Sequence, residues 1–407
     1  MAKEYIYKCV NCGSEYTNQE ILYLCPLCAK ENKEGQPLKG VLKVLYPYIE
    51  IKNRLEIQPD YLIKSDYIDL LPIHTVDSFP PLLVGKTPLY TYKQEGNIPF
   101  FLHLKVESSN PTFSFKDRAS ALVSAFAKEK GIQTIIAAST GNAGSSLAGI
   151  CASQKQKAII LVPEKAPKAK LTQVLMYGAK LIPVKGNYDD AYDLSLKLTE
   201  QKGWYNRNTA FNPLTIEGKK TVAFELFEQM DVFPDKVFVP VGDGVILAGV
   251  YKGFEDLLEL SLIDKIPQII AVQAEGSSNL IDNLFGEEHH FNSASTLADS
   301  ISVDIPRNFY MARDYINRFQ GLGIKVSDAE IIDASQYLAT QFGLFVEPAA
   351  AAAYAGLIKY QIEDQIVKDE QIVILLTGNG LKDIDSVFKS LDFPKPIDPN
   401  SFDLDMI

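Results

Sequence analysis

A single lysine, Lys116, is the residue of this chain whose surroundings most favour covalent chemistry. Polar turn-forming residues and two aromatic residues precede it, and an alanine-rich run with the pattern of a helix follows at Ala119–Lys130. Apolar neighbours and the positive end of a helix both disfavour an ammonium ion, so such a lysine loses its proton more easily. A neutral amine can attack an aldehyde, which is how a lysine forms a Schiff base with pyridoxal phosphate. The alternative interpretation is a solvated lysine that begins a helix.

A second candidate site consists of four cysteines in two Cys-x-x-Cys pairs, separated by twelve residues: Cys9, Cys12, Cys25 and Cys28. Each pair can turn its thiolates inward, and two such pairs supply a tetrahedral cage of sulfur atoms. Four protein ligands leave no open position, so the spacing predicts a small ribbon with a structural zinc ion. Iron in the same cage, two disulfides or free thiols are the alternatives.

Two further loops could bind anions. The first is Ser139, Thr140, Gly141, Asn142 and Ala143, whose backbone amides and hydroxyls could hold a carboxylate where a helix begins. The second is Gly242, Asp243, Gly244, Val245 and Ile246, a glycine-rich turn that enters a helix and exposes several N–H groups to one anion, usually a phosphate. Either loop alone could be an ordinary strand-to-helix turn.

These residues need a scaffold, and the sequence predicts an α/β fold. Strands are expected at Phe100–Val106, Thr134–Ala138, Ala158–Val162, Lys180–Val184, Lys236–Val241, Gln268–Gln273 and Gln371–Leu376. Helices are expected between most of them, at Ala143–Gln154, Pro167–Tyr177, Tyr188–Glu200 and Ile216–Gln229. Short apolar strands between helices indicate parallel sheets covered on both faces, which bind ligands at the carboxyl ends of their strands. Both anion-binding loops follow such strand ends.

The composition disfavours several classes of partner. The chain has 407 residues and a formal net charge of −11 at pH 7, which disfavours nucleic acid and anionic lipid. No run approaches the ~18 apolar residues of a membrane helix, and no signal peptide is expected, so we expect a cytoplasmic protein. The histidines have no metal-ligand or triad spacing, and ordinary roles are expected for His74, His103, His289 and His290.

Taken together, these segments resemble the threonine synthase group of fold-type II pyridoxal-phosphate enzymes. The similarity runs from the cysteine pairs to about Asp383. Its segments are Lys86–Leu89, Glu107–Arg118, Ser139–Asn142, Asn212–Pro213, Glu217–Thr221, Val239–Gly242, Val326–Asp328, Val346–Ala349 and Thr377–Asp383. The resemblance implies an α/β fold of the tryptophan synthase β type, with two doubly wound domains and an N-terminal zinc ribbon. We expect the ribbon at residues 1–45, a large cofactor-binding domain at 46–116 and 213–407, and a small mobile domain at 117–212.

The resemblance also implies roles for single residues. Lys116 would hold the cofactor covalently and move protons between Cα and Cβ of the substrate. Asn142 would bond the 3′-oxygen of the cofactor, Phe115 would pack near its ring, and Thr377 would face its pyridine nitrogen. A hydroxyl there makes the ring a weaker electron sink than a carboxylate does, which suits elimination and replacement. The loop Gly242–Ile246 would hold the cofactor phosphate, and the loop Ser139–Ala143 the substrate carboxylate.

Three departures from the family pattern concern the phosphate of the substrate. Ala143 stands where a threonine is expected, Thr215 where the family commonly carries an arginine, and Asp243 where it has an asparagine. Losing one charge-assisted hydrogen bond to a buried phosphate costs ~1.5–3 kcal/mol, and a nearby carboxylate costs more. The departures therefore predict a weakened site for O-phosphohomoserine.

The expected activity is that of a threonine synthase-like lyase that eliminates or replaces a group at Cβ or Cγ of a small L-amino acid. Threonine from O-phosphohomoserine is the family default. A serine/threonine ammonia-lyase, indicated by Ile246–Gly249 and Thr296–Ser300, and a β-replacement enzyme similar to cysteate synthase are the alternatives. A non-catalytic scaffold with a protein-binding ribbon is a third, and the joint presence of Lys116, Asn142 and Thr377 argues against it. Enzymes of this group are often homodimers.

Overall fold

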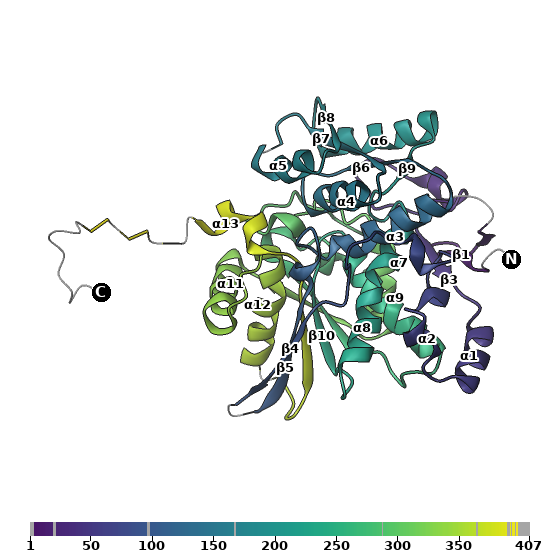
Figure 1. The fold of residues 1–407 in the computed structure, drawn as a ribbon. Coiled ribbons are helices and arrows are strands. Elements are labelled where there is room, and N and C mark those ends of the chain that lie inside the picture. Colours follow the sequence, from purple (N-terminus) through teal and green to yellow (C-terminus); the bar gives the residue numbers. More distant parts are fainter. Residues whose placement is uncertain are drawn as a thin grey trace.

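The computed structural model describes residues 4–18, 22–95, 98–166, 168–286, 288–363, 365–388, 391, 393–394 and 396–397. These residues form three sheets, of six, four and three strands (Figure 1). The two larger sheets are stacked above one another in Figure 1, and the smallest lies beside them near the N-terminus. No helix in the described part of the chain is long and apolar enough to cross a membrane.

The six-stranded sheet has the order β12-β11-β10-β13-β5-β4. Its strands are β4 (Leu89–Gln94), β5 (Phe100–Val106), β10 (Lys236–Pro240), β11 (Gln268–Ala274), β12 (Leu322–Val326) and β13 (Gln371–Leu376). Neighbours are parallel except for the antiparallel edge pair β4 and β5. Val237 and Val239 of β10 enter one core cluster and Phe238 enters another, as the two-residue period of a strand requires. Both faces of the sheet are therefore buried.

Helices cover both faces of this sheet. One core contains residues of α7 (Leu214–Lys219), α8 (Thr221–Gln229), α9 (Val245–Glu259) and α10 (Phe309–Arg318). The other contains residues of α11 (Asp328–Phe342) and α12 (Pro348–Ile362). A Cβ on Gly356 of α12 would lie 2.5 Å from a methyl group of Val272, so this glycine is needed where α12 crosses β11. The short helix α13 (Ile384–Phe388) follows β13.

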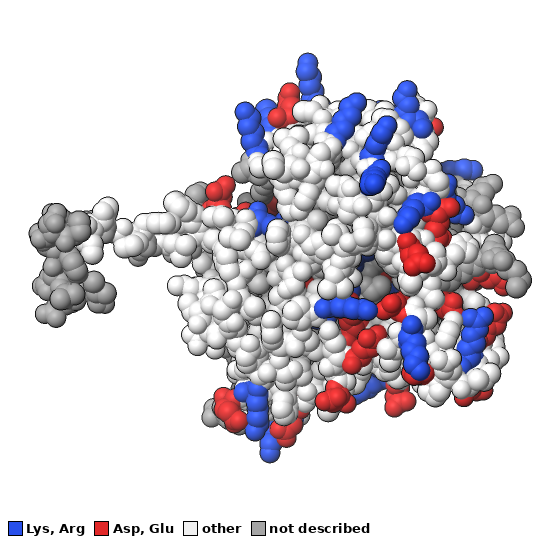
Figure 2. Space-filling view, viewed as in Figure 1, with Lys and Arg blue, Asp and Glu red and all other residues white. Residues whose placement is uncertain are grey.

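The four-stranded sheet lies above the larger one in Figure 1 and is parallel throughout. Its order is β8-β7-β6-β9, with β6 (Thr134–Ala138), β7 (Lys157–Pro163), β8 (Lys180–Val184) and β9 (Tyr205–Asn206). One core beside it holds residues of α3 (Lys116–Glu129), α4 (Asn142–Ser153) and α5 (Lys168–Met176), and another holds residues of α6 (Tyr188–Lys202). Figure 2 shows Lys and Arg side chains over this part of the molecule, whereas both signs of charge mix near the ribbon.

The N-terminal ribbon is an antiparallel sheet of β1 (Ile6–Cys9), β2 (Glu15–Thr17) and β3 (Leu42–Leu45). Two helices follow it, α1 (Tyr48–Ile57) and α2 (Tyr61–Lys64). The ribbon packs on the large core, where Lys43 Nζ lies 3.1 Å from the Glu255 carboxylate of α9. The hydroxyl of Tyr46 donates to Glu217 of α7 at 2.6 Å. The ribbon is therefore continuous with the core of the larger sheet.

The predicted elements mostly match. The strands expected at Phe100–Val106, Thr134–Ala138, Lys180–Val184 and Gln371–Leu376 have the bounds of β5, β6, β8 and β13. The sequence analysis missed β4, β9 and β12, and it placed no strands within the ribbon. Position 167, where another helix was expected to begin, lies outside the described residues, and the domain boundaries stay a prediction.

The single helix expected at Ile216–Gln229 is wrong, because α7 and α8 are separated at Lys220. The N–H of Ala223 donates to the carbonyl of Lys220 at 3.0 Å, three residues back, which tightens the chain there. Helix α9 approaches so closely at this point that a Cβ on Gly253 would lie 2.3 Å from the Lys220 carbonyl oxygen.

Candidate active site

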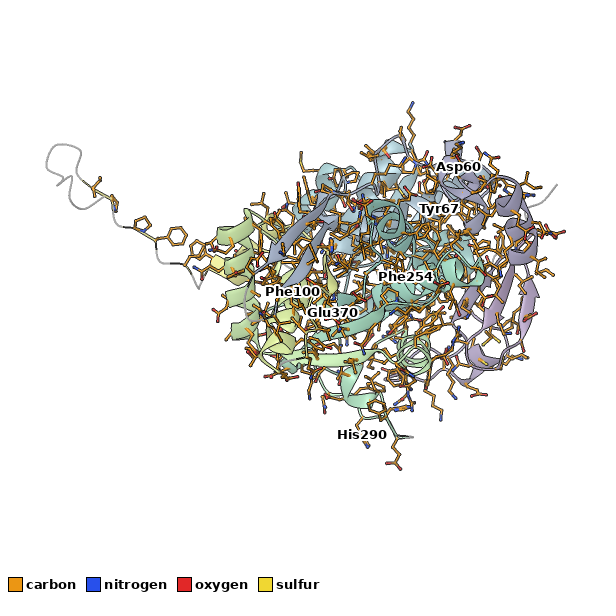
Figure 3. The ribbon with its side chains drawn as sticks, turned by 90° about the horizontal axis from the view of Figure 1, so that it is seen from below. Asp60, Tyr67, Phe100, Phe254, His290 and Glu370 are labelled. Atoms are coloured by element: carbon orange, nitrogen blue, oxygen red, sulfur yellow. The ribbon has the colours of Figure 1, made fainter. Side chains whose placement is uncertain are left out.

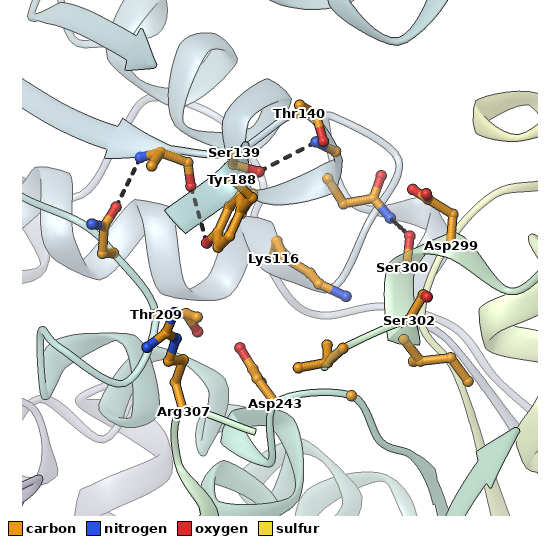
Figure 4. Close-up of a pocket in the computed structure, with 18 of the residues that line it drawn as sticks. Lys116, Ser139, Thr140, Tyr188, Thr209, Asp243, Asp299, Ser300, Ser302 and Arg307 are labelled. Atoms are coloured by element: carbon orange, nitrogen blue, oxygen red, sulfur yellow. Dashed lines mark hydrogen bonds between the residues drawn. The ribbon is translucent and has the colours of Figure 1, made fainter. Parts of the chain in front are cut away.

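Lys116 is the first residue of α3 and lines a cavity of about 450 Å³ between the two larger sheets (Figure 4). The chain just before it is attached to the end of β13. The N–H of Phe115 donates to the Thr377 carbonyl at 2.9 Å, and Ser114 forms a bridge with Gly378. Gly218 of α7 lets α3 come close, because a Cβ there would lie 2.4 Å from the Arg118 carbonyl oxygen. The lysine is therefore held by the strand end on one side and by α7 on the other.

Burial lowers the pKa of Lys116 from its ordinary value. The carboxylates of Glu347 and Asp243 oppose this shift, and the guanidinium of Arg207 adds to it. The environment therefore favours the neutral amine, which is the nucleophilic form of a lysine side chain.

The loop Ser139–Ala143 forms one wall of the cavity where α4 begins. The N–H of Gly141 donates to the Ser139 hydroxyl at 3.3 Å. A Cβ on Gly144 would lie 2.6 Å from the Ser139 carbonyl oxygen, so the turn requires glycine at that position. The loop offers backbone N–H groups, two hydroxyls and the positive end of α4, which are suited to a carboxylate.

The Asn142 side chain is oriented by a buried carboxylate. Its Nδ2 lies 3.1 and 2.8 Å from the two oxygens of Glu347, and 3.0 Å from the Ser300 hydroxyl. Burial raises the pKa of Glu347, against the nearby ammonium of Lys116 and the Asn142 amide. Gly378 is required beside this carboxylate, since a Cβ there would lie 2.3 Å from its atoms. Asn142, at the start of α4 beside the smaller sheet, is thus held by Glu347, which directly precedes α12 beside the larger sheet.

The glycine loop forms the opposite wall, at the N-terminus of α9. Gly242, Asp243, Gly244 and Ile246 line the cavity. The N–H of Val245 donates to the Asp243 carboxylate at 3.0 Å. Gly244 has φ +83°, and a Cβ on it would lie 2.9 Å from Ala312. A cluster of backbone donors at a helix N-terminus, facing a buried lysine across a cavity, fits a phosphate-bearing aldehyde cofactor.

The predicted residues do not all reach the cavity. Lys116, the whole loop Ser139–Ala143 and most of the glycine loop line it together. Val245 and Phe115 lie instead in the large core, and the Arg118 guanidinium lies 5.8 Å from the Phe115 ring. Thr377 is 1% exposed at the end of β13, and it also does not line the cavity.

Other cavity residues were not assigned roles from the sequence. Arg207 follows β9 directly, and Lys219 ends α7. Tyr188 and Arg307 also line the cavity, and Figure 4 shows Lys116, Tyr188 and Asp243 directed toward its centre. The position of Arg207 after a strand, and of Lys219 inside the segment Glu217–Thr221, could have identified both.

The cysteines form a separate cluster in the ribbon. The ligand atoms of Cys9, Cys12, Cys25 and Cys28 all lie within 4.8 Å of one another. The sulfur atoms of Cys9 and Cys28 are 3.8 Å apart and those of Cys12 and Cys25 are 3.7 Å apart, so the cysteines are not in disulfides. The histidines do not line the cavity, and His290 lies at the outer rim in Figure 3.

Comparison with known proteins decides the family. The model of the pyridoxal-phosphate dependent enzyme family matches residues 81–378, which include Lys116 and both anion-binding loops. This chain belongs to that family.

Relatives of this pyridoxal-phosphate-dependent enzyme are similar over nearly its whole length. It is 36% identical to a threonine synthase of Methanocaldococcus jannaschii, over 97% of this chain and 96% of the relative. It is 34% identical to a threonine synthase of Methanosarcina acetivorans with the same coverage. A threonine synthase of Mycobacterium tuberculosis is 36% identical over 84% of this chain and 95% of its own.

Solved structures have the same fold at lower identity. A serine racemase from maize superposes with a TM-score of 0.64 at 23% identity, over 75% of this chain and 91% of its own. A threonine deaminase from Solanum lycopersicum superposes with a TM-score of 0.64 at 23% identity, over 81% of this chain and 92% of its own. The predicted fold-type II architecture is therefore confirmed.

Proposed function

We propose that this enzyme is a threonine synthase-like lyase that acts on a small L-amino acid, with O-phosphohomoserine and water giving threonine and phosphate as the leading reaction. One observation carries the proposal: Lys116 shares a cavity with the loop Ser139–Ala143 and the glycine loop. The similarity to threonine synthases over 97% of the chain supports it. Membership of an enzyme family argues against the scaffold alternative.

The chain offers a group for each part of pyridoxal phosphate. Lys116 would bind its aldehyde carbon, and the backbone N–H groups of Gly242–Ile246 its phosphate. Asn142 would donate to its 3′-oxygen. The resemblance assigns its ring nitrogen to the Thr377 hydroxyl, although Thr377 does not line the cavity. When bound, the cofactor withdraws electrons from Cα of the substrate and makes the Cα proton acidic.

The protein supplies binding and proton transfer. The loop Ser139–Asn142 would hold the substrate carboxylate at the N-terminus of α4 and so fix Cα near Lys116. Because its pKa is lowered by burial, the Lys116 amine can accept the Cα proton and return it at a neighbouring carbon. The phosphate group then leaves from Cγ, and water adds at Cβ.

We also propose a structural zinc ion in the ribbon. Zinc bonds thiolate sulfur at ~2.3 Å in a tetrahedron, which separates the sulfur atoms by about 3.8 Å. The distances of 3.8 Å between Cys9 and Cys28 and 3.7 Å between Cys12 and Cys25 fit that geometry. Iron in the same cage is the alternative.

An activity on serine-like substrates is a second candidate, either ammonia release or β-replacement. Two of the three departures from the family pattern, Ala143 and Asp243, line the cavity. The third, Thr215, is buried, and its hydroxyl donates to the Asn212 carbonyl at 2.7 Å. None of these side chains supplies a cation to a substrate phosphate.

We propose in addition that residues 117–212 form a small domain that closes over the substrate, excluding bulk water from the reaction. This segment contains all four strands of the smaller parallel sheet. A homodimer in the cytoplasm is the expected setting for the enzyme.

The test is to incubate the holoenzyme with O-phospho-L-homoserine and to measure threonine and inorganic phosphate. L-threonine, L-serine and O-phospho-L-serine, the last with and without sulfite, are compared with it. Equal amounts of threonine and phosphate support the leading reaction. Keto acid or sulfonate from a β-substituted substrate, without phosphate from O-phosphohomoserine, supports the second candidate instead.

A further inference from the structure

Arg207 is a buried cation with an unused donor. It is 1% exposed and lines the cavity. Its Nε donates to the Ser120 hydroxyl at 3.2 Å, while Nη2 is buried and has no hydrogen-bond partner. The backbone around it is fixed, since its N–H donates to the Ile136 carbonyl at 2.8 Å. A rigid guanidinium with an unpaired donor is costly unless a ligand completes it.

Lys219 is a second cation in the same cavity. It is 2% exposed, and its Nζ has one distant contact, 3.4 Å to the Thr209 hydroxyl. Burial lowers its pKa to about 7, and Arg207 and Lys116 add to the shift while Asp243 opposes it. Gly249 of α9 leaves room for the side chain, because a Cβ there would lie 2.7 Å from the Lys219 Cβ.

Arg207 and Lys219, here called the pocket pair, differ from the buried cations that serve the fold. Lys220, next in sequence, lies 2.7 Å from the Asp256 carboxylate. Arg118 lies 2.7 Å from the Glu107 carboxylate. In the described part of the chain, neither member of the pocket pair has a carboxylate at such a distance. Buried cations that only stabilise a fold are paired, so the unpaired ones in a cavity point to a ligand.

Asp243 does not balance the pocket pair. Its carboxylate acts electrostatically on both cations, opposing the lowering of their pKa by burial, and it also accepts the Val245 N–H at 3.0 Å. Asp243 is thus one carboxylate against two cations, and Asp117 is a second carboxylate that acts on Arg207 alone. An anion placed here would fill the free Arg207 donor and approach the Lys219 ammonium.

We propose that the pocket pair binds a tetrahedral oxyanion carried by the side chain of the substrate, such as a phosphate or sulfate ester. This inference rests on the proposed function, in which the loop Ser139–Asn142 holds the substrate carboxylate and the glycine loop holds the cofactor phosphate. The oxyanion on the substrate side chain would be the third anion of the complex, after the substrate carboxylate and the cofactor phosphate, and residues outside both loops would bind it. The pocket pair thereby supplies the positive charge that Thr215, in place of an arginine, does not.

The experiment uses the cofactor-loaded enzyme, in which the cofactor occupies its own phosphate site. Inorganic sulfate is titrated by calorimetry and by the change in cofactor absorbance. Arg207→Gln and Lys219→Gln should each weaken sulfate binding about 10- to 100-fold, as expected for the loss of one charge-assisted hydrogen bond. Arg207→Lys keeps the charge and should recover part of the loss, which a folding defect would not allow.

Arg307→Gln is the matched control. Arg307 lines the same cavity, but its guanidinium is already paired with Asp189. Its removal should change sulfate affinity less than about 5-fold. If Arg307→Gln and Arg207→Gln lose sulfate affinity equally, Arg307 contributes to the anion site as much as Arg207 does. That result would overturn the assignment of the site to the pocket pair.

A pair of substrates separates this inference from the proposed function. O-phospho-L-homoserine and O-acetyl-L-homoserine carry their leaving groups on the same atom and differ in charge. Arg207→Gln and Lys219→Gln should raise KM for the phosphate ester about 10- to 100-fold and leave that for the acetyl ester nearly unchanged. If the wild type turns over neither ester, the proposed reaction fails while the sulfate titration still tests the pocket pair. Sulfate affinity that is unchanged in both variants, with or without loss of cofactor, overturns the inference.

Discussion

The backbone N–H of Phe115 donates to the carbonyl of Thr377 at 2.9 Å, although the two residues are 262 positions apart in the sequence. The bond attaches the residue before Lys116 to the end of β13. The bridge between Ser114 and Gly378 continues this contact. The segment just before Lys116 therefore pairs with the chain after β13 as a short additional strand would. The position of the amine therefore depends on a β-sheet, although the lysine itself begins a helix.

Lys116→Ala should abolish covalent cofactor binding. The purified variant should lose the absorbance of the bound cofactor, and turnover should fall at least about 10²–10⁴-fold, because the proton-transferring amine is gone. Lys128→Ala, at an exposed lysine of the same helix, should retain both properties. Borohydride reduction followed by peptide mass analysis identifies the modified lysine, and a label on any lysine other than Lys116 would contradict the prediction.

Gly378→Ala should destabilise the protein through Glu347. The new Cβ would lie 2.3 Å from the buried Glu347 carboxylate, which also holds the Asn142 amide. We expect the free energy of unfolding in denaturant to fall by about 1–3 kcal/mol, as for an overpacked core, and cofactor affinity to fall with it. In Gly141→Ala the Cβ has no atom within 4 Å, so its stability should stay near that of the wild type. Equal stability of both variants and wild type would mean that Glu347 moves away without cost.

The sequence predicted best the strands that are short apolar runs ending at turn-forming residues. β5, β6 and β13, which are largely buried, were located to the residue, and so was β8, an edge strand without a fully buried residue. β4 was missed because it is an exposed edge strand, in which polar residues alternate with half-buried ones. The division between α7 and α8 was also missed, since it arises where α9 contacts Lys220, and no local pattern reports that contact.

The candidate site could be predicted where backbone chemistry and local sequence define it. Lys116 and the two anion-binding loops belong to short contiguous motifs, and they meet at one cavity. The sequence positions of Arg207 and Lys219 could have marked them as residues near the site, but not as a pair of unpaired cations. Arg207 and Lys219 are distinguished by what they lack, a carboxylate partner, and that depends on the arrangement of the whole core. Sequence alone likewise could not show that Phe115 turns into the core.

Removing one cysteine of the ribbon should release the metal and destabilise the protein. Tyr23 lies between the two cysteine pairs in the sequence. Its ring stacks on that of Phe211, with the ring centroids 4.6 Å apart, and its hydroxyl accepts the Asn206 N–H at 2.9 Å. Loss of metal would therefore loosen a contact that reaches β9. Cys25→Ser should lower the zinc content from one equivalent to nearly none and the free energy of unfolding by about 3 kcal/mol or more.

Cys151→Ala is the control for that change, because Cys151 is buried in α4, away from the cluster. The metal content of this variant should stay at one equivalent, even where the cavity left by the removed thiol lowers the stability of the protein. Elemental analysis of both variants decides the question. Iron instead of zinc in the wild type would change the identity of the metal but not the assignment of its ligands, whereas full metal content in Cys25→Ser would contradict that assignment.

Sulfate binding to the holoenzyme should weaken as pH rises through neutrality. Burial lowers the pKa of Lys219 to about 7, so its side chain is an ammonium below that pH and an amine above it. The charged groups that face it are Asp243, Arg207 and Lys116. Arg207 has its pKa lowered only to about 10, and Lys116 would be bound to the cofactor, so neither changes charge in this range. Sulfate stays a dianion, so a decrease in affinity of about 10-fold between about pH 6 and about pH 8.5 would report Lys219.

Lys219→Gln provides the control for this pH dependence. A glutamine has no proton to lose, so the variant should bind sulfate weakly and nearly independently of pH over the same range. Calorimetric titration at several pH values measures both proteins under equal ionic strength, since sulfate binding is itself screened by salt. If wild type and Lys219→Gln lose affinity in parallel, another group carries the titration. In that case Lys219 does not contact the anion, and the oxyanion site consists of Arg207 alone.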